Sequence, residues 1–267
     1  MITLEERTAI LVTGNQSQSF LQGQLTCHVA AMQVGEWAFF GYCNHKGRVL
    51  ASGYLHYESL DCWIMVIATD LTPTVIPRLQ RSAILSGVKV SLNEAIHVLG
   101  SQKATQQSIQ LAETGYYLCL TKQAPTTAHS LQSTAWYLAE LQAQLPIIQT
   151  STSGLYTPHM LNLPNITLQR ISAVSFDQGC YVGQEVVSRI HHKGRHKKQW
   201  QLIQSSDRIQ LKITQTIYAA DQAIGTITQT IPTGTTWHAA MLPIERVSQP
   251  MHVMLTDHSP IPIRHAN

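Results

Sequence analysis

A cysteine and a tyrosine stand between two glycines in the stretch 178–185, and this short loop constrains the fold more than any other feature of the chain. Glycine reaches backbone conformations with positive φ and lets another segment approach closely, so Gly179 and Gly183 predict a tight loop with Cys180 at its apex. Residues Gln184–Arg189 are helix formers and predict a helix directly after the loop. The stretch predicts a thiol presented beside a helix N-terminus; the alternative is a small buried hydrophobe in a structural loop.

The same stretch resembles the K-G-C-Y-x-G-Q-E signature of the YgfZ family of folate-binding proteins, relatives of the aminomethyltransferase (T-protein) of glycine cleavage. The chain departs from this signature at its first position, where Gln178 replaces the family's lysine. Three further segments, Phe20–Thr26, Asn44–Val49 and Pro158–Leu163, resemble the family's F-L-Q-G-Q-x-T, n-x-K-G-R-v and P-x-M-L-N-L segments. The resemblance implies a site with Cys180 as a candidate reactive thiol and with the motif residues Gln178, Gly179, Tyr181, Gly183, Gln184 and Glu185.

The segment Asn44–Arg48 predicts a hairpin turn between two long strands. Lys46 and Arg48 flank a glycine in this turn, where they can meet the acidic tail of a ligand, such as the glutamate of a folate. A solvated hairpin tip is the alternative that the residues leave open. The resemblance implies that the ligand is tetrahydrofolate or another reduced folate. The expected folate-binding residues are Asn44, Lys46, Arg48 and Arg189.

Strand-like runs dominate the first part of the chain. The expected strands are Trp37–Tyr42, Val49–Tyr57 and Cys62–Ala68. A helix is expected over Thr134–Leu145, with Ser133 as its N-cap. Because strands and helices do not alternate strictly, the sequence predicts an α+β fold with a largely antiparallel sheet.

From Trp200 onward the pattern changes to short runs rich in Ile, Thr and Val, which recur about every ten residues. Such spacing is typical of a small closed or sandwiched β unit, and the resemblance implies a C-terminal β-barrel. We expect an aminomethyltransferase-like folate-binding region of two subdomains over 1–198, followed by the barrel domain over 199–267.

Charge and cysteine content argue against several classes of protein. The formal net charge of +3 is too small to indicate nucleic-acid binding. The five cysteines are scattered and include no C-x-x-C pair, so we expect neither a disulfide framework nor a metal site. No apolar run approaches the roughly 18 residues of a membrane span, and the first residues lack a signal-peptide pattern. A reduced, cytoplasmic protein without a membrane partner is expected.

Positive charge gathers only after the motif. The run contains the basic residues Arg189, Lys193, Arg195, Lys197 and Lys198, with His191, His192 and His196 between them. It is either a solvated linker or a patch that steers an anion. Because Trp200 is the only nearby aromatic residue on which a base can stack, direct RNA binding is not expected.

Three chemical hypotheses follow. The T-protein carries an aspartate just after the hairpin, where it meets the folate pterin, but Leu50 and Ala51 stand there in this chain. Neither side chain can accept the pterin hydrogen bonds, so aminomethyl transfer is not favoured. A second hypothesis makes Cys180 a nucleophile, with His191 or His192 as its base. Those histidines lie about two helical turns away, an awkward distance, and Gln178 lacks the charge that a lysine gives to a thiolate.

The third hypothesis is preferred. The resemblance implies a folate-binding accessory protein without turnover of its own, which serves the assembly or repair of iron–sulfur enzymes, including one that methylthiolates tRNA. Cys180 then contacts a cluster, a persulfide or the partner protein. The chain has no multi-cysteine spacing that suits a permanently bound cluster.

Overall fold

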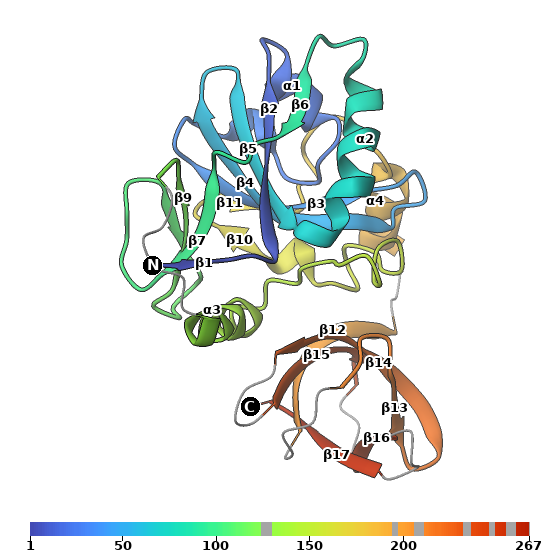
Figure 1. Ribbon diagram of the computed structural model, residues 1–267. Coiled ribbons are helices and arrows are strands. Elements are labelled where there is room, and N and C mark those ends of the chain that lie inside the picture. The colour runs from blue at the N-terminus through green and yellow to red at the C-terminus, as the bar shows by residue number, and fades with distance from the viewer. Residues whose placement is uncertain are drawn as a thin grey trace.

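The computed structural model of the chain describes residues 1–123, 130–193, 197–205, 211–231, 236–245, 249–254 and 260–266. The predicted class is confirmed: helices accompany antiparallel sheets, and a closed barrel forms the C-terminal part (Figure 1). None of the helices in these ranges combines the length and apolarity needed to cross a membrane.

A five-stranded antiparallel sheet with the order β3-β4-β5-β2-β6 forms the centre of the first part. Its strands are β2 (Arg7–Thr13), β3 (Trp37–Cys43), β4 (Val49–Ser59), β5 (Cys62–Ala68) and β6 (Lys89–Leu92). Strands β3, β4 and β5 are buried along most of their length, and β3 and β5 are almost continuously apolar, whereas β4 also buries Ser52 and His56. The predicted hairpin between β3 and β4 is confirmed.

Two smaller sheets complete the first part. The four-stranded sheet β1-β7-β9-β8 contains β1 (Ile2–Thr3), β7 (His97–Ser101), β8 (Ser108–Gln110) and β9 (Tyr117–Thr121). A two-stranded sheet pairs β10 (Thr167–Leu168) with β11 (Ile171–Ser172). All the pairs of strands in both sheets are antiparallel.

The helices cover the sheets and position the site. They are α1 (Ser17–Gln22), α2 (Thr72–Ala83), α3 (Ser130–Gln142) and α4 (Gln184–Lys193), with short 3₁₀ turns η1 (Val29–Ala31), η2 (Thr69–Leu71) and η3 (Leu163–Asn165). Helix α2 is amphipathic, because Val75, Leu79 and Ala83 are buried at helical spacing while Arg78 and Arg81 are exposed. The helix expected from Thr134 begins earlier, at Ser130, so Ser133 lies inside α3 and is not its N-cap.

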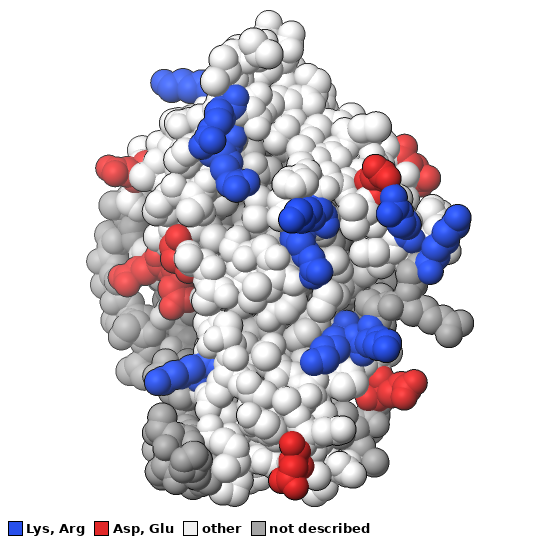
Figure 2. Space-filling model, turned by 90° about the vertical axis from the view of Figure 1, so that its right-hand side faces the viewer, with Lys and Arg blue, Asp and Glu red and all other residues white. Residues whose placement is uncertain are grey.

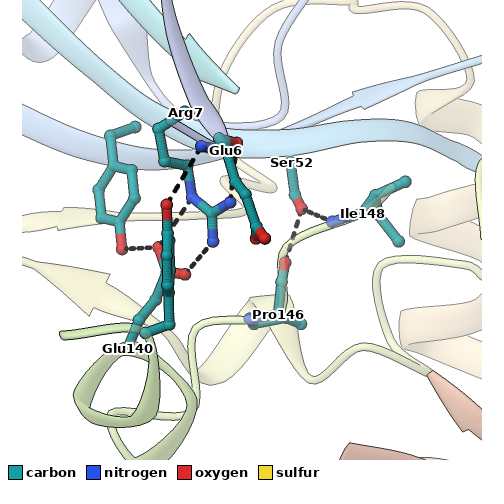
Figure 3. A network of polar contacts seen from close by, with 8 residues as sticks. Glu6, Arg7, Ser52, Glu140, Pro146 and Ile148 are labelled. Carbon is teal, nitrogen blue, oxygen red and sulfur yellow. Dashed lines mark hydrogen bonds and ion pairs between the residues drawn. The ribbon is translucent and has the colours of Figure 1, made fainter. Parts of the chain in front are cut away.

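A buried ion pair between Arg7 of β2 and Glu140 of α3 ties the central sheet to this helix (Figure 3). The Tyr54 hydroxyl donates to the Glu140 Oε1 at 2.8 Å, and the guanidinium carbon of Arg7 lies 5.0 Å from the centre of the Tyr137 ring. Burial lowers the pKa of Arg7, but the Glu140 carboxylate outweighs burial, so that the pKa is raised overall. Each charge therefore depends on the other, and loss of one partner typically costs about 3–5 kcal/mol.

The C-terminal barrel closes in the order β12-β15-β14-β13-β16-β17, and β17 pairs back with β12. Its strands are β12 (Lys198–Ser205), β13 (Thr216–Ala219), β14 (Gln222–Ile231), β15 (Thr236–Pro243), β16 (Met251–Met254) and β17 (Pro260–His265). Its interior is a separate apolar cluster, but buried Trp200, Ala239 and Met241 belong to the core of the first part. The barrel therefore packs against the first part, where β14 and β15 contact α3 and the Trp200 amide donates to the Met160 carbonyl at 2.8 Å, and the division into domains at 198/199 stays a prediction.

Candidate functional site

The side chain of Gln178 anchors the start of the motif loop. It is buried, and its Nε2 donates to the Thr26 carbonyl at 2.9 Å and to the Leu25 carbonyl at 3.2 Å. Its Oε1 accepts a hydrogen bond of 2.5 Å from Nε2 of Gln22, the last residue of α1. The residue that replaces the family's lysine thus holds the loop against the segment after α1.

The apex of the loop is exposed, and the side chain next to it is not. Gly179 and Cys180 face solvent, whereas Tyr181 is buried and burial beside Cys43 raises the pKa of its hydroxyl. The Val182 amide donates to the Gly23 carbonyl at 3.2 Å, which fixes the second half of the loop. The prediction of a presented thiol agrees with this geometry, because Cys180 is exposed between two anchored residues.

Gly183 lies directly against the turn of the β3-β4 hairpin. Its φ is +85°, and a Cβ at this position would lie 2.4 Å from the Asn44 carbonyl oxygen and 3.0 Å from the Gly47 Cα. Gly47 is also in the left-handed region, with a φ of +65°. A Cβ on Gly183 would push the two backbones apart, and a Cβ on Gly47 would lie 3.0 Å from the Val186 side chain, so both positions favour glycine.

Gly179 differs from Gly183 both in its backbone conformation and in the space around it. Its φ is not in the left-handed region, and a Cβ built on it would meet nothing within 4 Å. The expectation that both glycines of the motif shape the loop is therefore wrong for Gly179. Sequence spacing could not distinguish them, because the segment that contacts Gly183 lies far away along the chain.

The hairpin turn holds its own shape through Asn44. The Oδ1 of Asn44 accepts hydrogen bonds from the Lys46 amide at 2.9 Å and the Arg48 amide at 3.0 Å. Lys46 is exposed, whereas the Nη1 of Arg48 donates to the Leu155 carbonyl at 2.7 Å. Of the two cations expected to meet a ligand tail, Lys46 extends into solvent and Arg48 is already held at the surface.

Helix α4 begins at Gln184, where the sequence predicted a helix, and carries the remaining motif residues. The Gln184 Nε2 donates to the Gln178 carbonyl at 3.4 Å, which closes the loop on itself. The exposed side chains of Glu185 and Arg189 form an ion pair at 2.6 Å. Arg189 is thus paired along its own helix rather than with the hairpin.

The two histidines considered as a base for Cys180 have other neighbours. The His191 ring stacks on Phe176, with centroids 3.8 Å apart, and lies 5.8 Å from the ring of His159. His192 meets His191 edge-on at 5.1 Å. This arrangement gives no support to a thiol–imidazole pair. Arg195 and His196 of the basic run lie outside the described residues.

The structure places a pocket beside the hairpin and the motif loop, and sequence patterns did not predict it. Its volume is about 510 Å³. It is lined by Gln24, Tyr42, Cys43, Asn44, His45, Arg78, Arg81, Ser82 and Val182. The only available sequence signal was the spacing of Arg78 and Arg81, which puts both on one face of a helix. No group of three or more metal-binding side chains gathers within the described ranges.

Positions 50 and 51, where the T-protein carries its aspartate, supply no carboxylate here. Leu50 is half-buried and Ala51 is buried in β4. The Leu50 carbonyl accepts a hydrogen bond of 2.8 Å from the Ser153 hydroxyl, so this part of the hairpin is occupied by the segment before Leu155.

The fold defines the class of protein first. Across the whole chain the structure is similar to the aminomethyltransferase T of the glycine cleavage system from Bartonella henselae, with a TM-score of 0.74, 12% identity and 84% of that chain covered. An antiparallel body followed by a closed barrel makes the chain a protein of the aminomethyltransferase-like fold.

The relatives then identify the family. A protein of Haemophilus influenzae without an assigned function is 30% identical over 202 residues, which cover 74% of this chain and 70% of the relative. The tRNA-modifying protein YgfZ of Colwellia psychrerythraea is 27% identical over 230 residues, which cover 74% of this chain and 69% of the relative. The tRNA-modifying protein YgfZ of Buchnera aphidicola (subsp. Schizaphis graminum) is 27% identical over 246 residues, which cover 79% of this chain and 75% of the relative. No family model matches the chain. The chain belongs to the YgfZ family.

Proposed function

We propose that the chain is a cytoplasmic accessory protein that binds tetrahydrofolate or another reduced folate and has no turnover of its own. Its clients are iron–sulfur enzymes whose assembly or repair it supports, such as a tRNA methylthiotransferase. The similarity to an aminomethyltransferase supports a ligand related to folate, and the name of the relatives, tRNA-modifying proteins, supports a client that acts on tRNA. The lack of a carboxylate at Leu50 and Ala51 supports the absence of aminomethyl transfer.

The contact between Gly183 and Gly47 is the main observation that supports this proposal. It places the loop of Cys180 beside the hairpin of Lys46, so a ligand on the hairpin lies next to the thiol loop. In the proposed complex the acidic tail of the folate meets Lys46 and Arg48, and the Asn44 amide and Arg189 complete the site. Charge-assisted hydrogen bonds of this kind are stronger than neutral ones.

Cys180 is the group that meets the client protein in this proposal. Burial raises the pKa of Cys27 and that of Cys43 to about 12, so neither is available as a thiolate near neutral pH. Cys180 is exposed, and the anchored residues on either side keep it in one place. A partner surface can therefore reach this thiol without unfolding the loop.

Calorimetry with tetrahydrofolate tests the proposal. The wild-type chain should give a saturable isotherm, and the Lys46→Ala, Arg48→Ala double variant should bind about tenfold more weakly or worse, equivalent to roughly 1.4 kcal/mol. The matched control is the Lys103→Ala, Lys122→Ala double variant, which removes two exposed cations from the four-stranded sheet region. A flat isotherm for the wild type contradicts folate binding, and equal loss in both double variants contradicts the assigned site.

A further inference from the structure

The pocket beside the hairpin lies between α2, the end of β3 and the motif loop. It is lined by Arg78, Arg81 and Ser82 from α2, by Tyr42 and Asn44 from the hairpin, and by Val182 from the loop, among other residues. No acid is found among the described residues that line it. Figure 2 views the molecule from the side on which α2 and α4 lie in Figure 1, and blue side chains occupy the middle of this face while red ones lie toward its edges. The pocket is therefore electropositive.

The two arginines of the pocket stand out from others in the chain. Arg7, Arg170 and Arg189 each form an ion pair with a carboxylate. In the part of the chain that the structure describes, the guanidinium groups of Arg78 and Arg81 have neither an ion pair nor a hydrogen bond. They are three residues apart on an exposed face of α2, so both can approach one ligand. Two guanidinium forks without a protein partner match the oxygens of a phosphate or a carboxylate.

Neutral donors surround these arginines. Burial raises the pKa of Tyr42 while nearby Arg78 opposes the shift, so the hydroxyl stays protonated at neutral pH and lies close enough to Arg78 to feel its charge. The Asn44 Oδ1 is used within the hairpin turn, which leaves the Asn44 amide group to donate into the pocket. The pocket thus offers hydrogen-bond donors from α2 and from the hairpin to one set of acceptor oxygens.

We propose that this pocket is a binding site for an oxyanion of at least two negative charges, carried by a small molecule as a phosphate or as neighbouring carboxylates. Arg78 and Arg81 neutralise its charge, and Tyr42 and Asn44 donate to its remaining oxygens. The proposal does not rest on folate binding: the two sites share Asn44, but neither Lys46 nor Arg48 lines the pocket, and Arg78 and Arg81 are not part of the proposed folate site. Val182 connects the pocket to the loop that presents Cys180, so a bound anion lies beside that loop.

Calorimetry with pyrophosphate and, separately, with citrate in a low-salt chloride buffer tests the proposal. We expect saturable binding of one molecule of at least one probe per chain. The Arg78→Gln, Arg81→Gln double variant should weaken it at least tenfold, and Tyr42→Phe should weaken it severalfold. Tighter binding of pyrophosphate assigns a phosphate ligand, and tighter binding of citrate assigns a carboxylate ligand.

The matched control is the Lys212→Gln, Arg264→Gln double variant, which removes two exposed cations from the barrel region. It should bind both probes as the wild type does. Arg78 and Arg81 are exposed, so thermal melting should show that their double variant folds normally. The proposal is overturned if neither probe binds the wild type saturably, or if the Arg78→Gln, Arg81→Gln variant and the control variant bind equally well.

Discussion

The motif loop and the buried ion pair beneath the central sheet both join segments that are far apart along the chain, but they do so differently. Arg7 and Glu140 join β2 to α3 through opposite charges that water does not reach. Gly183 and Gly47 join the motif loop to the hairpin through bare backbone, with the thiol of Cys180 left in solvent nearby. The Arg7–Glu140 pair therefore contributes mainly to stability, whereas the Gly183–Gly47 contact mainly positions the exposed Cys180 loop.

Glu140→Ala should have the largest effect, because it leaves the Arg7 guanidinium buried without a counter-charge. We expect it to lower the free energy of unfolding by about 3–5 kcal/mol. Urea unfolding measures this loss, and Glu113→Ala, at an exposed acid, serves as the control with little effect. The alkylation rate of Cys180 in the folded protein should stay unchanged. A loss in stability below 1 kcal/mol would contradict the structural role of the pair.

Gly183→Ala should have an intermediate effect on stability and a strong effect on the site. The substitution puts a Cβ at a residue with a φ of +85° and within 2.4 Å of the Asn44 carbonyl oxygen. We expect a loss of about 1–3 kcal/mol, together with weaker folate binding and a changed alkylation rate at Cys180. Gly179→Ala is the matched control and should be nearly neutral. If the two alanine variants behave alike in urea unfolding and in calorimetry, the contact with the hairpin is not what requires the glycine.

Substitutions of Gln178 should have the smallest effect. Gln178→Ala removes the donor to the Leu25 and Thr26 carbonyls, and we expect it to lower the free energy of unfolding by about 1–2 kcal/mol. Gln178→Lys should cost less, because an ammonium group can donate to the same two carbonyls. Urea unfolding of both variants measures the difference. Wild-type stability of Gln178→Ala would show that the loop does not need this anchor.

The alkylation of Cys180 by iodoacetamide at several pH values separates anchoring from charge. In the sequence, Gln178 stands where the family has a lysine, so the positive charge of that lysine is absent beside Cys180. Restoring it in Gln178→Lys is therefore predicted to move the alkylation profile to lower pH. The structure adds that the side chain is buried and turned toward the segment after α1. A change in the alkylation profile without a change in stability would indicate that residue 178 acts on Cys180 through its charge. A change in stability without a change in the profile would indicate that it acts by anchoring the loop.

The sequence predicted those parts of the fold that depend on neighbouring residues. The strand Cys62–Ala68 has the predicted bounds, and α4 begins at the predicted Gln184. The hairpin turn was also predicted, because its apolar strands and its glycine lie next to each other in the chain. The order of strands and helices predicted the α+β class, and the runs after Trp200 predicted a closed or sandwiched β unit, which the resemblance to a known family specified as a barrel.

The rest of the site depends on contacts between distant segments. Gly183 meets Gly47, Gln178 binds the carbonyl of Thr26, and α2 brings Arg78 and Arg81 to the hairpin. No periodicity or composition encodes such pairs, because each is fixed by how the sheet and helices pack. For the same reason the sequence assigned equal roles to the two glycines of the motif.

The exposure of Cys180 among less accessible cysteines gives the molecule a natural labelling position. Cys27, Cys43 and Cys119 are buried, and partial burial raises the pKa of Cys62. A fluorescent maleimide at neutral pH should therefore attach first at Cys180, where a side chain facing solvent has room for a dye. The dye would lie on a loop in which Gly183 contacts the hairpin and Val182 lines the pocket beside the hairpin. One spectroscopic signal can thus report occupancy of either site in the intact chain.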